Sequence, residues 1–203
     1  MKIAIVGATG RIGSRILDEA LRRGHTVTAI ARKASASPAR EDVTTRDADV
    51  NDPHALAAAL AGNDVAVISV TFRSMTAEAV LEAVKRAGVP RLLVVGGAGS
   101  LEIRPGVALI DTPEFPEAFK PEAGAGRDFL TGLRKEQTVS WTFVSPSALI
   151  APGERTGTFR VGKDSLLVGP DGKSSISMED YAIGFMDEIE RPAHPRQRFT
   201  LGY

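Results

Sequence analysis

The sequence predicts an α/β fold with a doubly wound parallel sheet, and three observations lead to this prediction. Short apolar runs alternate with longer amphipathic stretches from the N-terminus to about residue 150. Several runs, such as Val65-Ala66-Val67-Ile68, are apolar at every position, which is typical of strands that helices cover on both faces. Helix-ending signals, basic residues followed by glycine, close two amphipathic stretches at Arg22-Arg23-Gly24 and Lys85-Arg86-Ala87-Gly88.

These patterns place six strands at residues 2–6, 26–31, 44–49, 65–70, 91–95 and 140–144. They place four helices between them, at residues 12–23, 53–61, 76–87 and 121–136. Strands that alternate with helices in this way form parallel sheets with right-handed crossover connections. We therefore expect a central sheet with helices on both faces.

The pattern changes after Ala151, where turn-rich segments replace the alternation. Ser177, with Asp180 three residues later, is typical of a helix N-terminus. We expect short strands at residues 156–161 and 165–168, a helix at 181–190 and a final strand at 198–201. Because this tail is too small to fold alone, we expect one domain over residues 1–203, with residues 151–203 forming a small C-terminal lobe on the substrate side.

The composition excludes several classes of function. Basic and acidic residues number 25 each, so no net field attracts nucleic acid or an anionic membrane. The absence of cysteine excludes disulfides and thiolate catalysis, and the three histidines lack metal-ligand spacing, so we expect no metal site. The N-terminus does not resemble a signal peptide, and no apolar run approaches the roughly 20 residues needed to cross a bilayer. We expect a cytoplasmic protein, with a monomer and a dimer both open.

A glycine-rich junction follows the first apolar run and opens the first predicted helix. It has the sequence Gly7-Ala8-Thr9-Gly10-Arg11-Ile12-Gly13. In a Rossmann-type fold, glycines at this spacing allow the tight turn, the close approach of a pyrophosphate to helix N-terminal amides, and close packing of helix on strand. We therefore expect a bound dinucleotide, held by Gly7, Thr9, Gly10, Arg11, Ile12 and Gly13.

The end of the second predicted strand indicates which dinucleotide. A carboxylate at this point binds the ribose hydroxyls of NAD, but here the strand ends in Arg32-Lys33. Arginine binds a 2′-phosphate well, so we expect Arg32, with Arg11 opposite, to favour NADP(H) over NAD(H). The alternative is that Arg32 and Lys33 are solvated loop charges. Asp49 is expected beside the adenine, or else acts only as a turn residue.

Ligands of such sheets bind beyond the carboxyl ends of the strands. We therefore expect the nicotinamide end to be lined by Ser69, Val70 and Thr71 after the fourth strand, Gly96 and Gly97 after the fifth, and Ser145 and Ser147 after the sixth. Ser100 is the candidate catalytic hydroxyl for hydrogen bonding to a substrate carbonyl or a flavin edge. Its alternative role is structural.

The usual proton-transfer apparatus is missing from the sequence. Ordinary short-chain dehydrogenases use a tyrosine followed four residues later by lysine, but neither Tyr181 nor Tyr203 has such a lysine. Phe119 stands in the region where the pair is expected, and phenylalanine cannot donate a proton. Phe72, Phe115 and Phe119 could stack on a flat ring, or could equally pack within the protein.

Several segments resemble the atypical short-chain dehydrogenase/reductases. They are the glycine motif, Gly96-Gly97-Ala98-Gly99-Ser100-Leu101, Asp111-Thr112-Pro113-Glu114-Phe115-Pro116, residues 176–182 and Arg198-Phe199-Thr200. Within these enzymes the chain is most similar to the group described as NADH-flavin reductases, neighbours of the biliverdin-IX-beta/flavin reductases. The resemblance spans the chain and implies an NAD(P)H-dependent reductase.

The main hypothesis is thus an NADPH-dependent oxidoreductase that transfers hydride to a flavin, a quinone or a similar planar small molecule. The flavin would be a substrate rather than a bound prosthetic group. A regulatory protein that senses NAD(P) without turnover is the alternative. An epimerase-like enzyme acting on a nucleotide sugar is a weaker one, because its proton-transfer tyrosine is absent.

Overall fold

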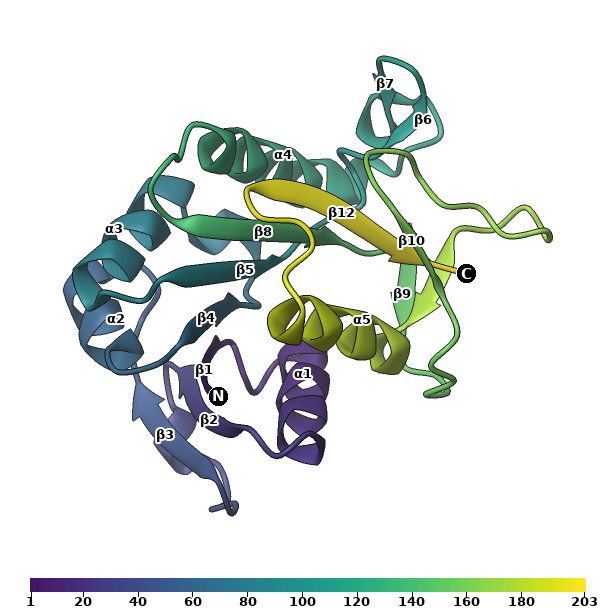
Figure 1. Ribbon diagram of the computed structural model, residues 1–203. Helices are drawn as coiled ribbons and strands as arrows, with labels where there is room; N and C mark the ends of the chain where they lie inside the picture. Colours follow the sequence, from purple (N-terminus) through teal and green to yellow (C-terminus); the bar gives the residue numbers. More distant parts are fainter.

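The computed structural model describes residues 1–203 and is built on an eight-stranded sheet in the order β10-β12-β8-β5-β4-β1-β2-β3 (Figure 1). Its strands are β1 (Lys2–Val6), β2 (Thr26–Ala31), β3 (Val43–Asp47), β4 (Val65–Ile68), β5 (Arg91–Val95), β8 (Ser140–Ser145), β10 (Arg160–Gly162) and β12 (Gln197–Gly202). All neighbouring strands pair in parallel except β10, which pairs antiparallel to β12.

Five α-helices cover the two faces of this sheet. They are α1 (Arg11–Arg22), α2 (Pro53–Leu60), α3 (Ala77–Ala87), α4 (Lys120–Arg134) and α5 (Met178–Glu190). Helices α1 and α5 lie side by side on one face, and α2, α3 and α4 lie on the other (Figure 1). None of the five combines the length and hydropathy that a membrane span requires.

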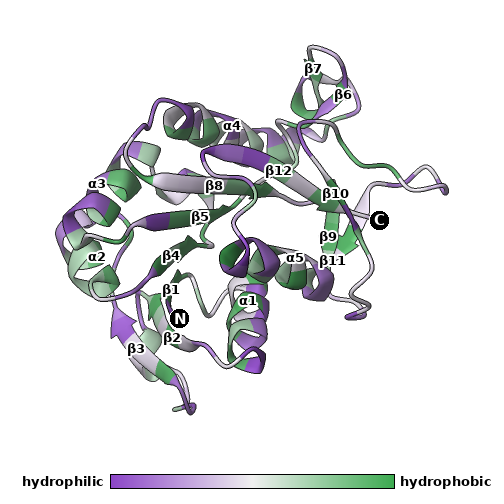
Figure 2. Cartoon of the chain, in the orientation of Figure 1, coloured by the Kyte–Doolittle hydropathy of each residue, from purple (hydrophilic) through white to green (hydrophobic).

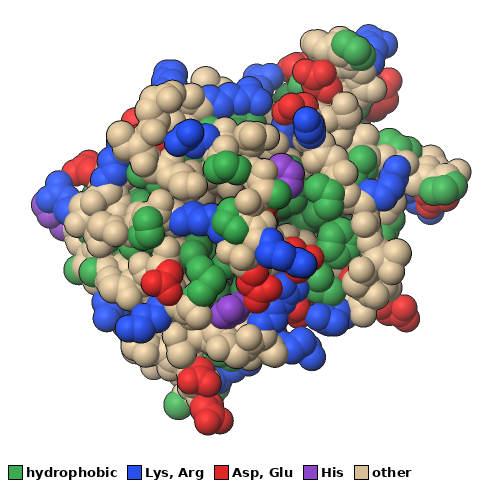
Figure 3. Space-filling model, in the orientation of Figure 1, with side chains coloured by type: hydrophobic (Ala, Val, Ile, Leu, Met, Phe, Trp, Pro, Cys, Tyr) green, Lys and Arg blue, Asp and Glu red, His purple; other side chains and the backbone are tan.

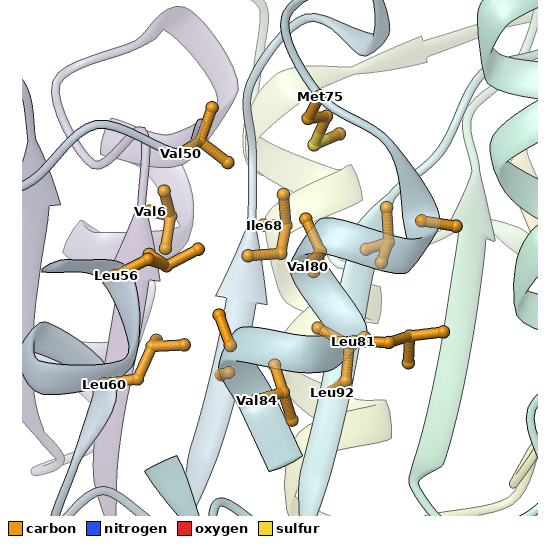
Figure 4. Packing of buried hydrophobic residues seen from close by; sticks show 14 of the residues in the cluster. Val6, Val50, Leu56, Leu60, Ile68, Met75, Val80, Leu81, Val84 and Leu92 are labelled. Atoms are coloured by element: carbon orange, nitrogen blue, oxygen red, sulfur yellow. The ribbon is translucent and has the colours of Figure 1, made fainter. Parts of the chain in front are cut away.

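Each face buries its own hydrophobic cluster. Figure 4 shows Val6 of β1 and Ile68 of β4 pointing toward Leu56 of α2 and Val80 of α3. Every residue of β4 is buried, whereas β3 at the edge alternates half-buried and exposed positions, and Figure 2 shows the corresponding change from hydrophobic to hydrophilic. These two strands therefore confirm that apolar runs mark the centre of a sheet covered on both faces.

The predicted α/β sheet and its first six strands and four helices are confirmed, with boundaries shifted by at most two residues. Two helix starts follow from local chemistry. The Asp52 carboxylate accepts hydrogen bonds from the amides of His54 and Ala55 at the start of α2. The Thr76 hydroxyl accepts one from the amide of Ala79 at the start of α3. Such caps satisfy amides that have no partner within the helix.

The C-terminal segment was predicted less accurately. The final strand and the last helix are present, and the Ser177 hydroxyl caps α5 by accepting from the amide of Asp180 at 2.9 Å. The strand expected at residues 156–161 is wrong except at its end. The Asp180 carboxylate holds Thr156 and Gly157 instead, by bonds of 2.5 and 2.8 Å. The strand expected at residues 165–168 is wrong as well, because only Ser165 forms an isolated bridge, to Glu102.

Two small sheets were not predicted from the sequence. Strands β6 (Glu102–Arg104) and β7 (Val107–Ala108) form a hairpin that projects from the body of the molecule (Figure 1). Strands β9 (Leu149–Ala151) and β11 (Ser175–Ser177) pair in parallel. At two or three residues each, these strands are too short to show a periodicity. Four short 3₁₀ helices, η1 (Ala34–Ala36), η2 (Phe72–Ser74), η3 (Leu109–Asp111) and η4 (Glu117–Phe119), complete the elements.

Glu136 stabilises the connection between α4 and β8. Its buried carboxylate accepts from the amides of Thr138 and Val139 at 2.6 and 3.0 Å, and pairs with Lys85 Nζ at 2.6 Å. Burial raises the pKa of this carboxyl, but the hydrogen bonds from Lys85, Thr138 and Val139 outweigh burial and bring the pKa down to about 2. The charged form is therefore the form that stabilises the fold.

Replacing Glu136 with glutamine is expected to lower the free energy of unfolding by about 2 kcal/mol at neutral pH. A lowered pKa in the folded state means that this stability is complete above the ordinary pKa of 4.5 and is lost as pH falls toward 2. Denaturant unfolding of wild type and Glu136→Gln from pH 7 to pH 2 measures the difference. Glu82→Gln removes an exposed ion pair with Arg86 and serves as the control, with an expected change below about 0.5 kcal/mol. A Glu136 effect that does not diminish at low pH would contradict the assignment.

Candidate cofactor-binding site

A cleft of about 530 Å³ opens at the carboxyl ends of β1, β2, β4 and β5. The order of the sheet reverses between β1 and β4, since the chain adds strands toward β3 on one side and toward β12 on the other. Open α/β sheets bind their ligands at such a switch point. The residues predicted for the cofactor that line this cleft are Gly7, Thr9, Gly10, Arg11, Ile12, Arg32, Asp49, Ser69, Val70, Thr71 and Gly96.

The glycine loop is packed too closely to accept larger residues. Gly7 has a φ of +84°, and a Cβ at this position would lie 2.2 Å from the carbonyl oxygen of Ser69. Gly13 does not line the cleft, and its Cβ would lie 2.2 Å from the carbonyl oxygen of Gly7. The lack of a side chain at Gly13 therefore allows α1 to pack against the loop. The same lack at Gly7 allows the loop to pack against the end of β4.

The N-terminus of α1 is open toward the cleft. No side chain caps it at Gly10, and its first turn holds no acidic residue. Side chains cap α2, α3 and α5. The first amides of a helix carry partial positive charge and have no partner within the helix. The loop and these free amides fit the pyrophosphate of a dinucleotide.

Two arginines line this cleft. Arg11 begins α1 and Arg32 follows β2; both side chains are exposed and neither forms an ion pair. The nearby carboxylate of Asp47 is engaged by Ser35, whose hydroxyl and amide donate at 2.6 and 2.9 Å and hold the pKa of Asp47 below its ordinary value. Arg32 is thus left free for a ligand.

Asp49 both lines the cleft and holds a turn. Its Oδ1 accepts from the amide and side chain of Asn51, at 2.9 and 3.2 Å. The two roles weighed for Asp49 are compatible, because the carboxylate is exposed and its second oxygen forms no hydrogen bond within the protein.

The opposite end of the cleft contains three residues that the sequence did not single out as ligands. Ser74, Val95 and Glu122 line it beside Thr71, Phe72 and Gly96. Of these, Glu122 comes from the start of α4, about 50 residues beyond β4 in the sequence, and no local pattern marks it. Only the packing of α4 on η2 brings it to the cleft.

Phe72 belongs to the core, although it lines the cleft. Its ring is 6% exposed and packs against Phe129 and Phe143, with ring centroids 5.4 and 5.8 Å away. Gly126 of α4 makes room for it, since a Cβ there would lie 2.9 Å from the ring. Of the two roles considered for Phe72, these contacts favour packing over stacking on a ligand.

Four residues predicted near the nicotinamide lie outside the cleft lining: Gly97, Ser100, Ser145 and Ser147. The Ser100 hydroxyl accepts from the buried guanidinium of Arg198 at 3.3 Å, and Arg198 also donates to Asp164 at 2.6 Å. Ser147 donates to the carbonyl oxygen of Leu201. The catalytic role of Ser100 stays a prediction. Its hydrogen bond with Arg198 favours the alternative, a structural role.

Neither tyrosine reaches the cleft. Tyr181 is fully buried and donates to the carbonyl oxygen of Val144 at 2.6 Å, and burial raises its pKa well above the ordinary value. The Tyr203 hydroxyl donates to Asp180 and accepts from the amide of Ser177. No tyrosine or lysine lines the cleft, so the structure supplies no equivalent of the tyrosine–lysine pair there.

The geometry agrees with comparison to known proteins. A family described as NAD(P)H-binding matches residues 7–192. The chain belongs to this family. The match begins at Gly7 and ends at residue 192, just beyond α5. It therefore includes the glycine loop, helix α5 and every residue that lines the cleft except Val6.

Three relatives are similar over nearly their whole length. Uncharacterized protein YwnB of Bacillus subtilis is 41% identical, over 99% of this chain and 98% of its own. A "putative epimerase" from Bacteroides thetaiotaomicron is 41% identical with a TM-score of 0.93, covering 100% of this chain and 96% of that one. A "putative NADH-flavin reductase" from Streptococcus pneumoniae is 36% identical with a TM-score of 0.87, covering 100% and 99%. The atypical short-chain reductase resemblance and the Rossmann-type fold are therefore confirmed.

Proposed function

We propose that this protein is an NADPH-dependent oxidoreductase that passes hydride to a flavin, a quinone or a similar planar acceptor. One observation carries the proposal. The uncapped N-terminus of α1 and two arginines without ion-pair partners meet at one end of a cleft at the switch point of the sheet.

The residues divide the work of holding the cofactor. Gly7, Thr9, Gly10, Ile12 and Gly13 form the loop and helix start that suit the pyrophosphate. Arg32, with Arg11, suits the 2′-phosphate, and Asp49 lies on the adenine side. Residues Ser69, Val70, Thr71 and Gly96 line the nicotinamide end. When bound, the cofactor supplies the hydride.

The cleft favours an acceptor that needs no strong acid from the protein. No tyrosine or lysine lines it, so a carbonyl substrate would lack the usual proton donor. A flavin or quinone can take its proton from solvent. The same absence disfavours epimerase-like chemistry, although one relative is named for it.

Steady-state oxidation of NADPH with FMN, riboflavin and a naphthoquinone tests the proposal. We expect acceptor-dependent loss of NADPH absorbance. Calorimetric titration with NADPH alone measures binding independently. Tight binding without turnover on any acceptor would contradict the enzyme and support a protein that senses NADPH without consuming it.

A further inference from the structure

We propose that the acceptor end of the cleft selects uncharged planar acceptors, and that Glu122 determines this selectivity by repelling anions. This inference rests on the proposed function and specifies its substrate class. It follows from how charge is distributed along the cleft and from how firmly the Glu122 carboxylate is held.

Four charged side chains line the cleft, three at one end and one at the other. Arg11, Arg32 and Asp49 belong to the adenosine end, at the glycine loop and beyond β2 and β3. Glu122 is the one charged residue at the other end, where half-buried Val70 and the small exposed parts of Phe72 and Val95 form apolar surface. A flat, neutral ring fits this surface, and an anionic ring would face an uncompensated carboxylate.

Two backbone amides hold the Glu122 carboxylate in place. Oε1 accepts from the amide of Phe72 at 2.6 Å, and Oε2 accepts from the amide of Arg73 at 3.3 Å. These amides begin η2, the short helix that follows β4. Because both oxygens are engaged by amides on one wall of the cleft, the carboxylate cannot swing away to avoid an approaching anion.

Glu122 forms no ion pair with a basic side chain. The side chain of Arg73 is exposed and does not line the cleft. Lys120, two residues before Glu122, pairs with Glu117, and Arg127 pairs with Asp111 at 3.0 Å. No basic side chain therefore pairs with the carboxylate at this end of the cleft. At a partly solvated separation of about 6 Å, such a charge is expected to disfavour an anionic acceptor by about tenfold.

The test compares menadione, which is neutral, with 1,4-naphthoquinone-2-sulfonate, which carries a negative charge on the ring system. The measured quantity is the ratio of their kcat/KM values with NADPH. Since the two quinones differ in intrinsic reactivity, the change in this ratio on mutation is decisive. We expect Glu122→Gln to shift the ratio about tenfold toward the sulfonate.

Asp128→Asn is the matched control, because Asp128 lies on the same helix α4, is exposed, forms no ion pair and does not line the cleft. It is expected to leave the ratio unchanged. A general loss of stability in Glu122→Gln affects both quinones alike and cancels in the ratio. A ratio that Glu122→Gln does not move overturns this inference alone. No turnover of either quinone by the wild-type protein overturns the inference together with the proposed function.

Discussion

Replacing Arg32 with aspartate is expected to raise the KM for NADPH by about 100-fold while changing the KM for NADH by only a few-fold. Arg32 is exposed, lines the adenosine end of the cleft and has no ion-pair partner. Charge-assisted hydrogen bonds to a phosphate contribute about 1.5–3 kcal/mol, and each 1.4 kcal/mol corresponds to about tenfold in affinity. Aspartate would remove these bonds and add repulsion of the 2′-phosphate.

Lys33→Asp supplies a control with the same change of charge one residue away. Lys33 is also exposed but does not line the cleft, so its substitution is expected to alter both cofactors' KM values by a few-fold at most. Steady-state kinetics with NADPH and NADH on all three proteins measure the effect. Equal losses for both cofactors in Arg32→Asp, or equal effects of the two substitutions, would show that Arg32 does not bind the 2′-phosphate.

Replacing Gly7 with alanine is expected to weaken NADPH binding by at least about 100-fold and to destabilise the fold by about 3 kcal/mol or more. The positive φ of Gly7 strains any side chain, and the added Cβ would also lie 2.2 Å from the carbonyl oxygen of Ser69. Relief of that clash requires the loop to move away from β4, which displaces the start of α1 from the cleft.

Gly24→Ala separates the effect of a positive φ from the effect of the clash with a neighbouring carbonyl oxygen. Gly24 has a φ of +76°, close to that of Gly7, but nothing lies within 4 Å of the Cβ position. Its substitution is expected to cost about 1–2 kcal/mol and to leave NADPH affinity unchanged. Calorimetric titration and thermal unfolding measure both quantities. Wild-type NADPH affinity in Gly7→Ala would contradict the role of the loop.

Figure 3 shows basic and acidic side chains interspersed over the face it presents, with no extended field of one sign. The charges that matter for the proposed activity are individual ones in the cleft. This is why the predictions concern single residues, such as Arg32 and Glu122, rather than net charge.

That the glycine loop and Arg32 line one cleft could be predicted, because these residues are close together in the sequence. The glycine loop lies within seven residues of β1, and Arg32 ends the next strand, so strand–helix alternation alone brings them to one edge of the sheet. The lining of the other end of the cleft could be predicted only in part. Thr71 and Gly96 follow strands and line the cleft, but Ser100, five residues beyond β5, forms a hydrogen bond with Arg198 instead.

The sequence by itself determined the parallel sheet, the order of its first elements and the loop suited to a dinucleotide, because periodicity and glycine spacing are local properties. The tertiary structure alone decided what lines the other end of the cleft. Helix α4 packs on η2 and brings Glu122 to amides that lie about 50 residues away in the chain. It likewise decided that β12 and β10 extend the main sheet and that Tyr181 is buried against β8. Such contacts depend on how distant surfaces fit together, and no pattern within one segment encodes that fit.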